Sequence, residues 1–180
     1  VSRSVSTSLF AVSTAPSSTT FDHAALSSDY SYLTVGSSVQ LTAAGVSATK
    51  NKVDLPEGTS WAVADESMGT IDQNGVFTAK ANGDVEIRLI LDKEIVGETT
   101  LHVVTPDNLY FKKTSANVVY GESIAIPVNA VYNNKNVASN GNDIVFTLSD
   151  ERAGTFKGLN FIAAESKLKN LKITESLPDN

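Results

Sequence analysis

The chain has 180 residues, 41% of them hydrophobic, contains no cysteine, and carries a formal net charge of −6 at pH 7. The lack of cysteine excludes disulfides, thiolate metal sites and cysteine nucleophiles. The basic residues are dispersed apart from "KLKNLK" at Lys167–Lys172, so nucleic acid is not an expected partner, since a phosphate backbone needs a clustered basic face. No apolar run reaches the length of a transmembrane helix, and we expect no membrane insertion.

Residues 1–20 differ in composition from the rest of the chain. Eleven of these twenty residues are Ser or Thr. Such a segment buries too little apolar surface to offset its ordering entropy, so we predict a linker or tail. The apolar stretch "SLFAV" at Ser8–Val12 leaves a second interpretation open, in which it pairs as an edge strand.

From Phe21 onward, short runs of β-forming residues alternate with turn signals, which is typical of a sandwich or barrel. The stretch Asp84–Leu91 places its apolar side chains on one face, and Glu98–Val104 repeats that pattern. Asn74-Gly75 is a strong signal for a tight turn. No stretch has a sustained helical period, and the sequence therefore predicts an all-β protein.

Thr105-Pro106-Asp107 interrupts the strand pattern, because proline lacks the amide donor that a central strand needs. We place a domain boundary here. One β-sandwich is predicted over residues 21–105 and a second over residues 106–180, with a short Pro-containing hinge between them.

The chain resembles itself when it is shifted by 85 positions. Between residues 36–79 and 121–164, ten of 44 positions are identical without a gap, and Ala79 aligns with Ala164. A one-residue slip then aligns Ile87 with Ile173. We infer two copies of one β-module. Nothing in the second copy corresponds to "ETTLHVV" at Glu98–Val104, so we expect that sandwich to lack its last strand, and we hypothesise that Ser8–Val12 could supply it.

The first copy carries a recognisable motif. Trp61-x-Val63-x-Asp65 is followed by "GTIDQNGVFTA" at Gly69–Ala79 and by an alternating strand, and this pattern resembles the bacterial Ig-like domain of group 2. The resemblance implies tandem immunoglobulin-like sandwiches of a secreted or cell-surface protein. The second copy is divergent, with Lys157 in place of the motif aspartate. A weaker resemblance links the layout to accessory modules of surface phosphodiester glycosidase-type enzymes of gut Firmicutes.

Candidate chemistry is sparse. His23 and His102 lack a nucleophile and an orienting group at recognisable spacing, so we predict no catalytic residues and no enzyme activity in this chain. Asp65-Glu66 and Asp150-Glu151 are adjacent pairs, which suit a turn better than the alternating ligands of a calcium loop. We therefore predict no metal site and no cofactor, and keep calcium as an alternative.

Tyrosines are the best candidates for ligand contacts. Tyr30 and Tyr32 share a face if their segment is extended, and could form a platform for stacking sugars. Tyr110 and Tyr120 are weaker candidates, and burial at the end of a sandwich is the alternative for all four.

These observations favour a non-catalytic spacer or adhesion module that positions a neighbouring domain of its parent protein. The alternative is a carbohydrate-binding accessory module of a larger glycosidase, with cell-surface or dietary glycans as partners.

Overall fold

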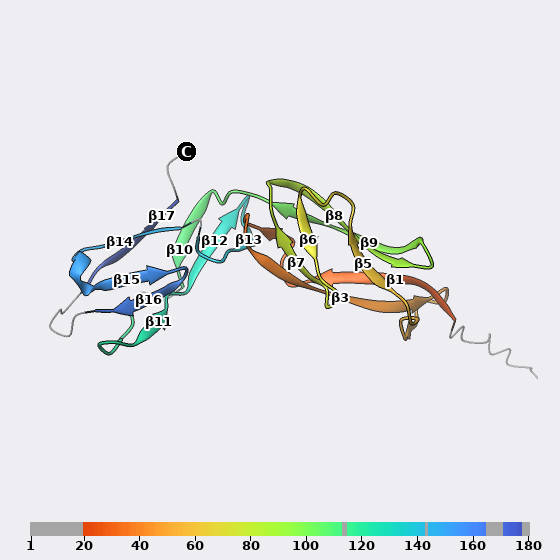
Figure 1. The fold of residues 1–180 in the computed structure, drawn as a ribbon, viewed down its shortest axis with the longest axis horizontal. Coiled ribbons are helices and arrows are strands. Elements are labelled where there is room, and N and C mark those ends of the chain that lie inside the picture. Colours follow the sequence, from red (N-terminus) through yellow and green to blue (C-terminus); the bar gives the residue numbers. More distant parts are fainter. Residues whose placement is uncertain (1–19, 113–114, 143, 165–170, 178–180) are drawn as a thin grey trace, which may run out of the picture.

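A computed structural model describes residues 20–112, 115–142, 144–164 and 171–177. Within these ranges the chain is built from strands and one short 3₁₀ helix, and two β-modules lie end to end (Figure 1). In the described part of the chain, no helix has both the length and the apolar character needed to cross a bilayer. The predicted fold class, all-β with immunoglobulin-like sandwiches in tandem, is confirmed.

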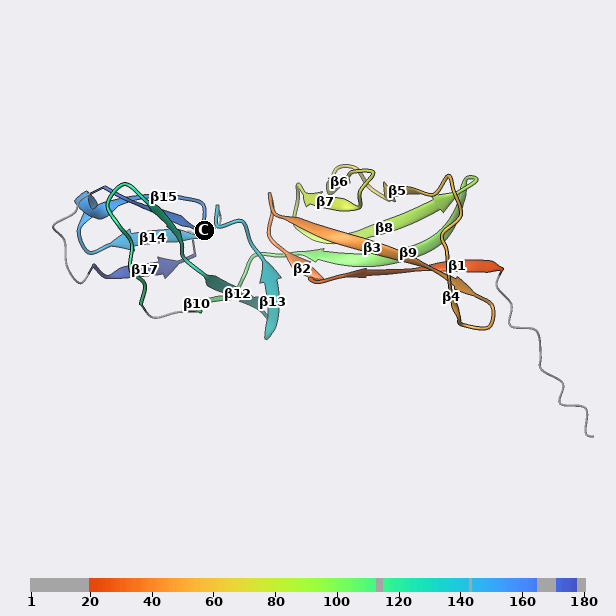
Figure 2. The same ribbon diagram turned by 90° about the horizontal axis from the view of Figure 1, so that it is seen from below.

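The first module comprises residues 20–104 and consists of two packed sheets, which overlap in the view of Figure 2. One sheet has the order β1-β3-β7-β6, with β4 paired to β3, and the other contains β5-β8-β9-β2. The strands are β1 (Phe21–Ser28), β2 (Tyr32–Leu33), β3 (Ser38–Ser47), β4 (Lys52–Val53), β5 (Ser60–Val63), β6 (Gly69–Ile71), β7 (Val76–Ala79), β8 (Gly83–Leu91) and β9 (Glu94–Val103).

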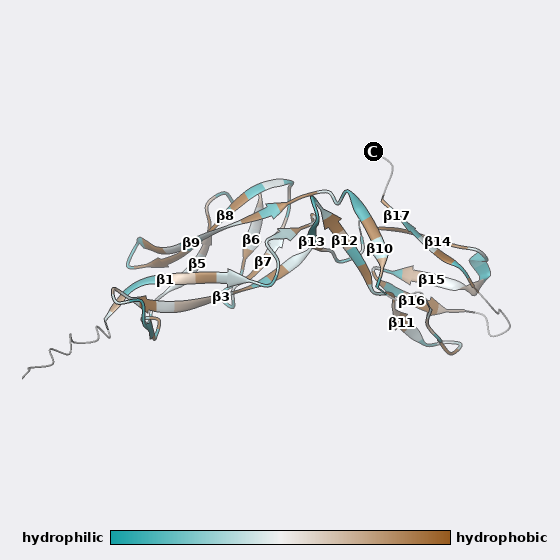
Figure 3. Ribbon diagram, turned by 180° about the vertical axis from the view of Figure 1, so that it is seen from behind, coloured by the Kyte–Doolittle hydropathy of each residue, from teal (hydrophilic) through white to brown (hydrophobic). Residues whose placement is uncertain are grey.

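The core of this module follows from the period-two alternation of its long strands. Every second residue of β8 is buried, from Val85 through Ile87 to Leu89, and the strand is coloured in alternating hydrophilic and hydrophobic bands in Figure 3. Phe77 from the opposite sheet is fully buried, and Trp61 packs against the same cluster. Alternating side chains from two facing sheets therefore fill one continuous core, as in other β-sandwiches.

The second module comprises the described residues from 106 onward. Its elements are β10 (Asn108–Phe111), β11 (Ser123–Ala125), β12 (Val128–Tyr132), β13 (Lys135–Ala138), β14 (Val145–Leu148), the 3₁₀ helix η1 (Glu151–Ala153), β15 (Gly154–Lys157), β16 (Asn160–Ala163) and β17 (Ile173–Ser176). Its core contains Phe161, and the rings of Phe146 and Phe156 stack with centroids 4.3 Å apart.

The two modules pair their strands in the same order. The pairs β1–β3, β3–β4, β3–β7, β7–β6 and β5–β8 of the first module correspond to β10–β12, β12–β13, β11–β16, β16–β15 and β14–β17 of the second. Val63 pairs with Ile87, and Leu148 pairs with Ile173, as the one-residue slip in the sequence alignment requires. The shift found in the sequence therefore corresponds to a shared pairing scheme.

The ungapped alignment is wrong at the second hairpin. Gly69 pairs with Ala79, whereas Gly154 pairs with Ala163 rather than with Ala164. The second hairpin is one residue shorter, because Lys157 pairs with Asn160 across a two-residue turn that has no room for the longer Asp72–Gly75 loop of the first module.

In the first module, β9 lies beside β8. Among the described residues of the second module, β17 is the counterpart of β8 and pairs only with β14, and no strand takes the place of β9. The segment Ser8–Val12, which we hypothesise could fill this place, lies outside the described residues, as does most of the predicted tail. The donated strand therefore stays a prediction.

The modules share a sheet. Its order is β10-β12-β13-β2-β9-β8-β5, so β13 of the second module pairs directly with β2 of the first (Figure 2). The linker between the modules, residues 105–107, also bonds to the second module. Pro106 is buried, the Asp107 amide donates to the Val131 carbonyl at 2.9 Å, and the Asp107 carboxylate accepts from the Asn133 amide at 2.9 Å. The expected hinge at Thr105–Asp107 is thus bound to the second module.

Candidate binding site at the module junction

Strand β2 forms the middle of the junction, because it pairs in parallel with a strand on each side. Tyr32 is opposite His102 of β9 and Val137 of β13. Beyond the strand, the Thr34 amide donates to the Ala138 carbonyl at 3.0 Å. Each parallel pair is only two residues long, so side chains must supply the remaining contacts.

The turn after β2 provides those contacts. The buried Ser37 hydroxyl lies 2.8 Å from the Thr34 hydroxyl and accepts a hydrogen bond from the Asn140 amide at 3.0 Å. The Asn140 side-chain amide donates to the Gly36 carbonyl at 2.8 Å. Gly36 has φ 79°, a left-handed conformation that glycine adopts without strain, and this presents its carbonyl to the second module.

Both candidate ligand-binding tyrosines lie at this junction. Tyr30 and Tyr32 line one open depression of about 710 Å³. The other lining residues come from both modules and are Asp29, Ser31, His102, Lys135 and Asn136. Tyr30 also borders a second hollow of about 320 Å³, which Ser37 and Asn140 help to line.

The two tyrosines differ in how much of the ring is available. Tyr30 is 38% exposed. The ring of Tyr32 stacks on His102 with centroids 4.7 Å apart and lies 6.0 Å from the ring of Tyr132. His102 Nδ1 lies 2.7 Å from an Asp84 carboxylate oxygen, which fixes the imidazole. Tyr30 is therefore the freer aromatic surface, and Tyr32 is part of a packed aromatic group.

The polar groups that line the depression can all take part in hydrogen bonds. The Asp29 carboxylate can accept them, the Asn136 side-chain amide can accept and donate them, and the Lys135 ammonium can donate them. Aromatic side chains beside a few polar groups are a composition that small-molecule sites share. His102 is engaged with Asp84 and Tyr32, so it is placed to support the wall of the depression.

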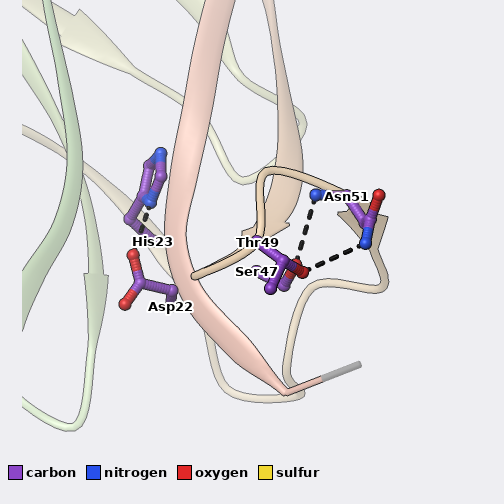
Figure 4. A network of polar contacts seen from close by, with 5 residues as sticks. All are labelled: Asp22, His23, Ser47, Thr49 and Asn51. Atoms are coloured by element: carbon purple, nitrogen blue, oxygen red, sulfur yellow. Dashed lines mark hydrogen bonds and ion pairs between the residues drawn. The ribbon is translucent and has the colours of Figure 1, made fainter. Parts of the chain in front are cut away.

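The second histidine lies at the far end of the first module. His23 Nδ1 is 2.8 Å from an Asp22 carboxylate oxygen, and both side chains are more than half exposed (Figure 4). Nearby, the buried Ser47 hydroxyl accepts from the Asn51 amide at 3.2 Å, and the Asn51 side chain donates to Thr49 at 3.0 Å. These bonds close the turn between β3 and β4 and explain the polar group as turn structure.

The acidic pairs also serve turns. Asp65 accepts from both the hydroxyl and the amide of Ser67, at 2.6 and 2.9 Å, and these bonds lower the pKa of its carboxyl. Asp150 caps the 3₁₀ helix, and hydrogen bonds from the side chain and the amide of Arg152 lower its pKa. Within the described ranges, no group of three or more acidic or histidine side chains is arranged to hold a metal ion.

The remaining tyrosines lie on the second module. Tyr110 accepts a hydrogen bond from the Asn129 side chain at 2.7 Å, and Tyr120 is 62% exposed. Neither lines the depression. Sequence reasoning missed Lys135, Asn136 and Asn140, because a pairing between strands about 100 residues apart leaves no local signal in the sequence.

The fold defines the class of protein. Two facing sheets with an alternating core and antiparallel hairpins make an immunoglobulin-like sandwich. Residues 20–103 match the family model described as bacterial Ig-like domain (group 2). The first module of this chain thus matches that family, as its motif indicated.

Among solved structures, an intimin mutant from EHEC O157:H7 is similar at 18% identity, over 51% of this chain and 54% of that chain, with a TM-score of 0.36. Domains 4 and 5 of the S-layer protein SbsC match at 11% identity, over 89% and 94%, with a TM-score of 0.39. The Escherichia coli adhesin FdeC matches at 10% identity, over 88% and 60%, with a TM-score of 0.37. The matched region is about half of the intimin chain. No curated protein matches the chain.

Proposed function

We propose that the chain is a non-catalytic spacer and adhesion unit of a secreted or cell-surface bacterial protein, and that it holds a neighbouring domain at a fixed position. The observation that carries this proposal is the sheet that passes from one module into the other through β2 and β13. A repeated Ig-like module with a held junction can transmit orientation along a chain, whereas a flexible linker cannot.

Several weak contacts combine at this junction. Its cross-module hydrogen bonds include Thr34 to Ala138 and the two bonds from Asn140 to the turn after β2. Each intramolecular hydrogen bond contributes roughly 0.5–1.5 kcal/mol, and a buried partner left without one costs about 1–3 kcal/mol. Removing the Ser37 hydroxyl leaves the Thr34 hydroxyl without this hydrogen-bond partner and the Asn140 amide without its acceptor, so it should weaken the junction by about 2–3 kcal/mol.

The experiment measures the distance distribution between the modules. Because the chain has no cysteine, Glu57→Cys and Glu151→Cys place one spin label on an exposed position in each module. We expect a narrow distribution by double electron–electron resonance in the parent chain and a broad one after Ser37→Ala.

The matched control is Ser38→Ala. Ser38 is the next residue in the chain and hydrogen-bonds Thr78 at 2.7 Å within the first module only. Its removal should leave the distribution narrow. A broad distribution in the parent chain, or equal broadening in both variants, would contradict the proposed rigid spacer.

A carbohydrate-binding role is the second candidate, and one observation favours it. Tyr30 and Tyr32, singled out from the sequence, line the same depression as Asp29, Lys135 and Asn136. The test is binding of the whole chain to immobilised glycans and mucin, with and without calcium. Saturable binding that weakens on Tyr30→Ala and persists in Tyr120→Ala would support it. Equal loss in both variants, or no binding, would refute it.

A further inference from the structure

The turn after β2, which contacts the second module, has a counterpart within the second module. In the first module this turn is Thr34–Ser37, and a shift of 85 places it at Val119–Glu122. The two turns share their hydrogen bonds. The Ser37 amide donates to the Thr34 carbonyl at 3.1 Å, and the Glu122 amide donates to the Val119 carbonyl at 3.0 Å.

The glycines of the two turns correspond as well. Gly36 and Gly121 both have φ 79°. The Gly36 amide donates to Ala79, and the Gly121 amide donates to Ala163, both at 2.9 Å. Only glycine holds this angle without strain, so the same local structure has been built at both sites.

The surroundings of the two turns differ. A Cβ added at Gly36 would meet the Asn140 side chain at 3.4 Å, whereas one added at Gly121 would meet nothing within 4 Å. Thr34 is 2% exposed, but Val119 is 64% exposed and the adjacent Tyr120 is 62% exposed. The ends of the turn, Thr34 and Ser37, are therefore covered in the first module, whereas their counterparts Val119 and Glu122 are exposed in the second. Together with Tyr120, Val119 presents a large apolar surface there.

The complementary edge is also duplicated. Strand β13, which covers the first turn, corresponds to β4, because Ala130 pairs with Val137 as Gly45 pairs with Val53. Ala138, whose carbonyl accepts the junction bond, therefore corresponds to Asp54. Among the described residues, β4 pairs only with β3, so its outer edge is open at the opposite end of the chain.

From these correspondences we infer that Val119–Glu122 is a docking platform for another Ig-like module, which presents an edge of the β4 or β13 kind and sits on it as the second module sits on the first. The partner is identified by its shape, namely an open strand edge whose carbonyl can accept from the turn as the Ala138 carbonyl accepts from the Thr34 amide. Such a head-to-tail interface joins two different surfaces, so it extends an array of modules in one direction unless the rotation between modules closes a ring. The inference goes beyond the proposed rigidity of the internal junction.

The test uses the intact chain as both partners, since its own β4 edge is the matching surface. One copy carries Val119→Cys, the other carries Asp54→Cys, and a short bis-maleimide links sites that meet. Tethering through residues 105–107 gives the internal junction an effective concentration on the order of 1 mM. The two copies are therefore mixed at a similar concentration.

The control replaces Val119→Cys with Val145→Cys, an exposed apolar position on β14 away from the turn. We expect the 119–54 product to exceed the 145–54 product several-fold. Adding Tyr120→Asp to the Val119→Cys copy should remove that excess, while thermal melts show that the variant still folds. Equal yields at positions 119 and 145 would overturn the inference, and the spin-label distances of the single chain would be unaffected by that result.

Discussion

Gly69 offers a sharp test of how tightly the first module is packed. A Cβ added at this buried glycine would overlap the ring of Phe77 and come within 2.6 Å of the Thr78 carbonyl oxygen. Phe77 is fully buried between the sheets and is part of the core cluster. Overpacking of a core typically costs 1–3 kcal/mol, and this contact involves both a ring and a backbone atom, so we expect Gly69→Ala to cost about 3 kcal/mol.

Gly58→Ala is the matched control. Gly58 has φ 86° in an exposed loop, and an added Cβ would meet nothing within 4 Å. Its replacement should cost only the strain of a left-handed alanine, about 1 kcal/mol. At about 4–8 °C per kcal/mol for a domain of this size, Gly69→Ala should lower the melting temperature by roughly 12–24 °C and Gly58→Ala by much less.

The second module provides an internal repeat of the experiment. A Cβ at Gly154 would approach the ring of Phe161 at 2.7 Å, so Gly154→Ala should destabilise the second module as Gly69→Ala destabilises the first. Urea unfolding gives the free energies, and amide hydrogen exchange identifies which module loses protection. If Gly69→Ala cost no more than Gly58→Ala, the packing of Gly69 against Phe77 would be refuted.

Two further changes have defined outcomes. Because hydrogen bonds from Ser67 lower the pKa of Asp65 in the folded chain below its usual value of 3.8, the carboxylate stabilises the fold above that value and loses this contribution as the pH falls through the folded-state pKa. Asp65→Asn should therefore flatten the loss of stability below pH 4 in urea titrations, and an unchanged acid limb would contradict the assignment. Asn140→Ala removes the donor to Gly36, so it should broaden the spin-label distances without lowering the melting temperature of the first module, and an unchanged distribution would count against that bond.

The sequence predicted the fold because its signals are local. The alternation in β8 placed Val85, Ile87 and Leu89 in the core. Asn74-Gly75 marked the turn between β6 and β7, and Gly75 takes φ 80° there. Strand alternation and turn dipeptides depend only on residues within a few positions along the chain, so the sequence pattern alone predicts these structures.

The junction could not be predicted in the same way. Ser37 and Asn140 lie 103 residues apart, and neither belongs to a motif. The hinge expected at Pro106 was a local inference from a strand-breaking residue, and it took no account of a sheet that continues through a different pair of strands. The sequence predicted one face for Tyr30 and Tyr32 in an extended segment, and both line the depression, but part of its lining comes from the other module.

We propose that the two modules form one rigid unit through β2 and β13. Residual dipolar couplings of backbone amides, measured in both modules of the intact chain, test this proposal. We expect one alignment tensor to fit the couplings from residues 20–104 and those from the described residues of 106–177 in the observed orientation. Two tensors of different magnitude would show that the modules move independently, and would refute the rigid unit.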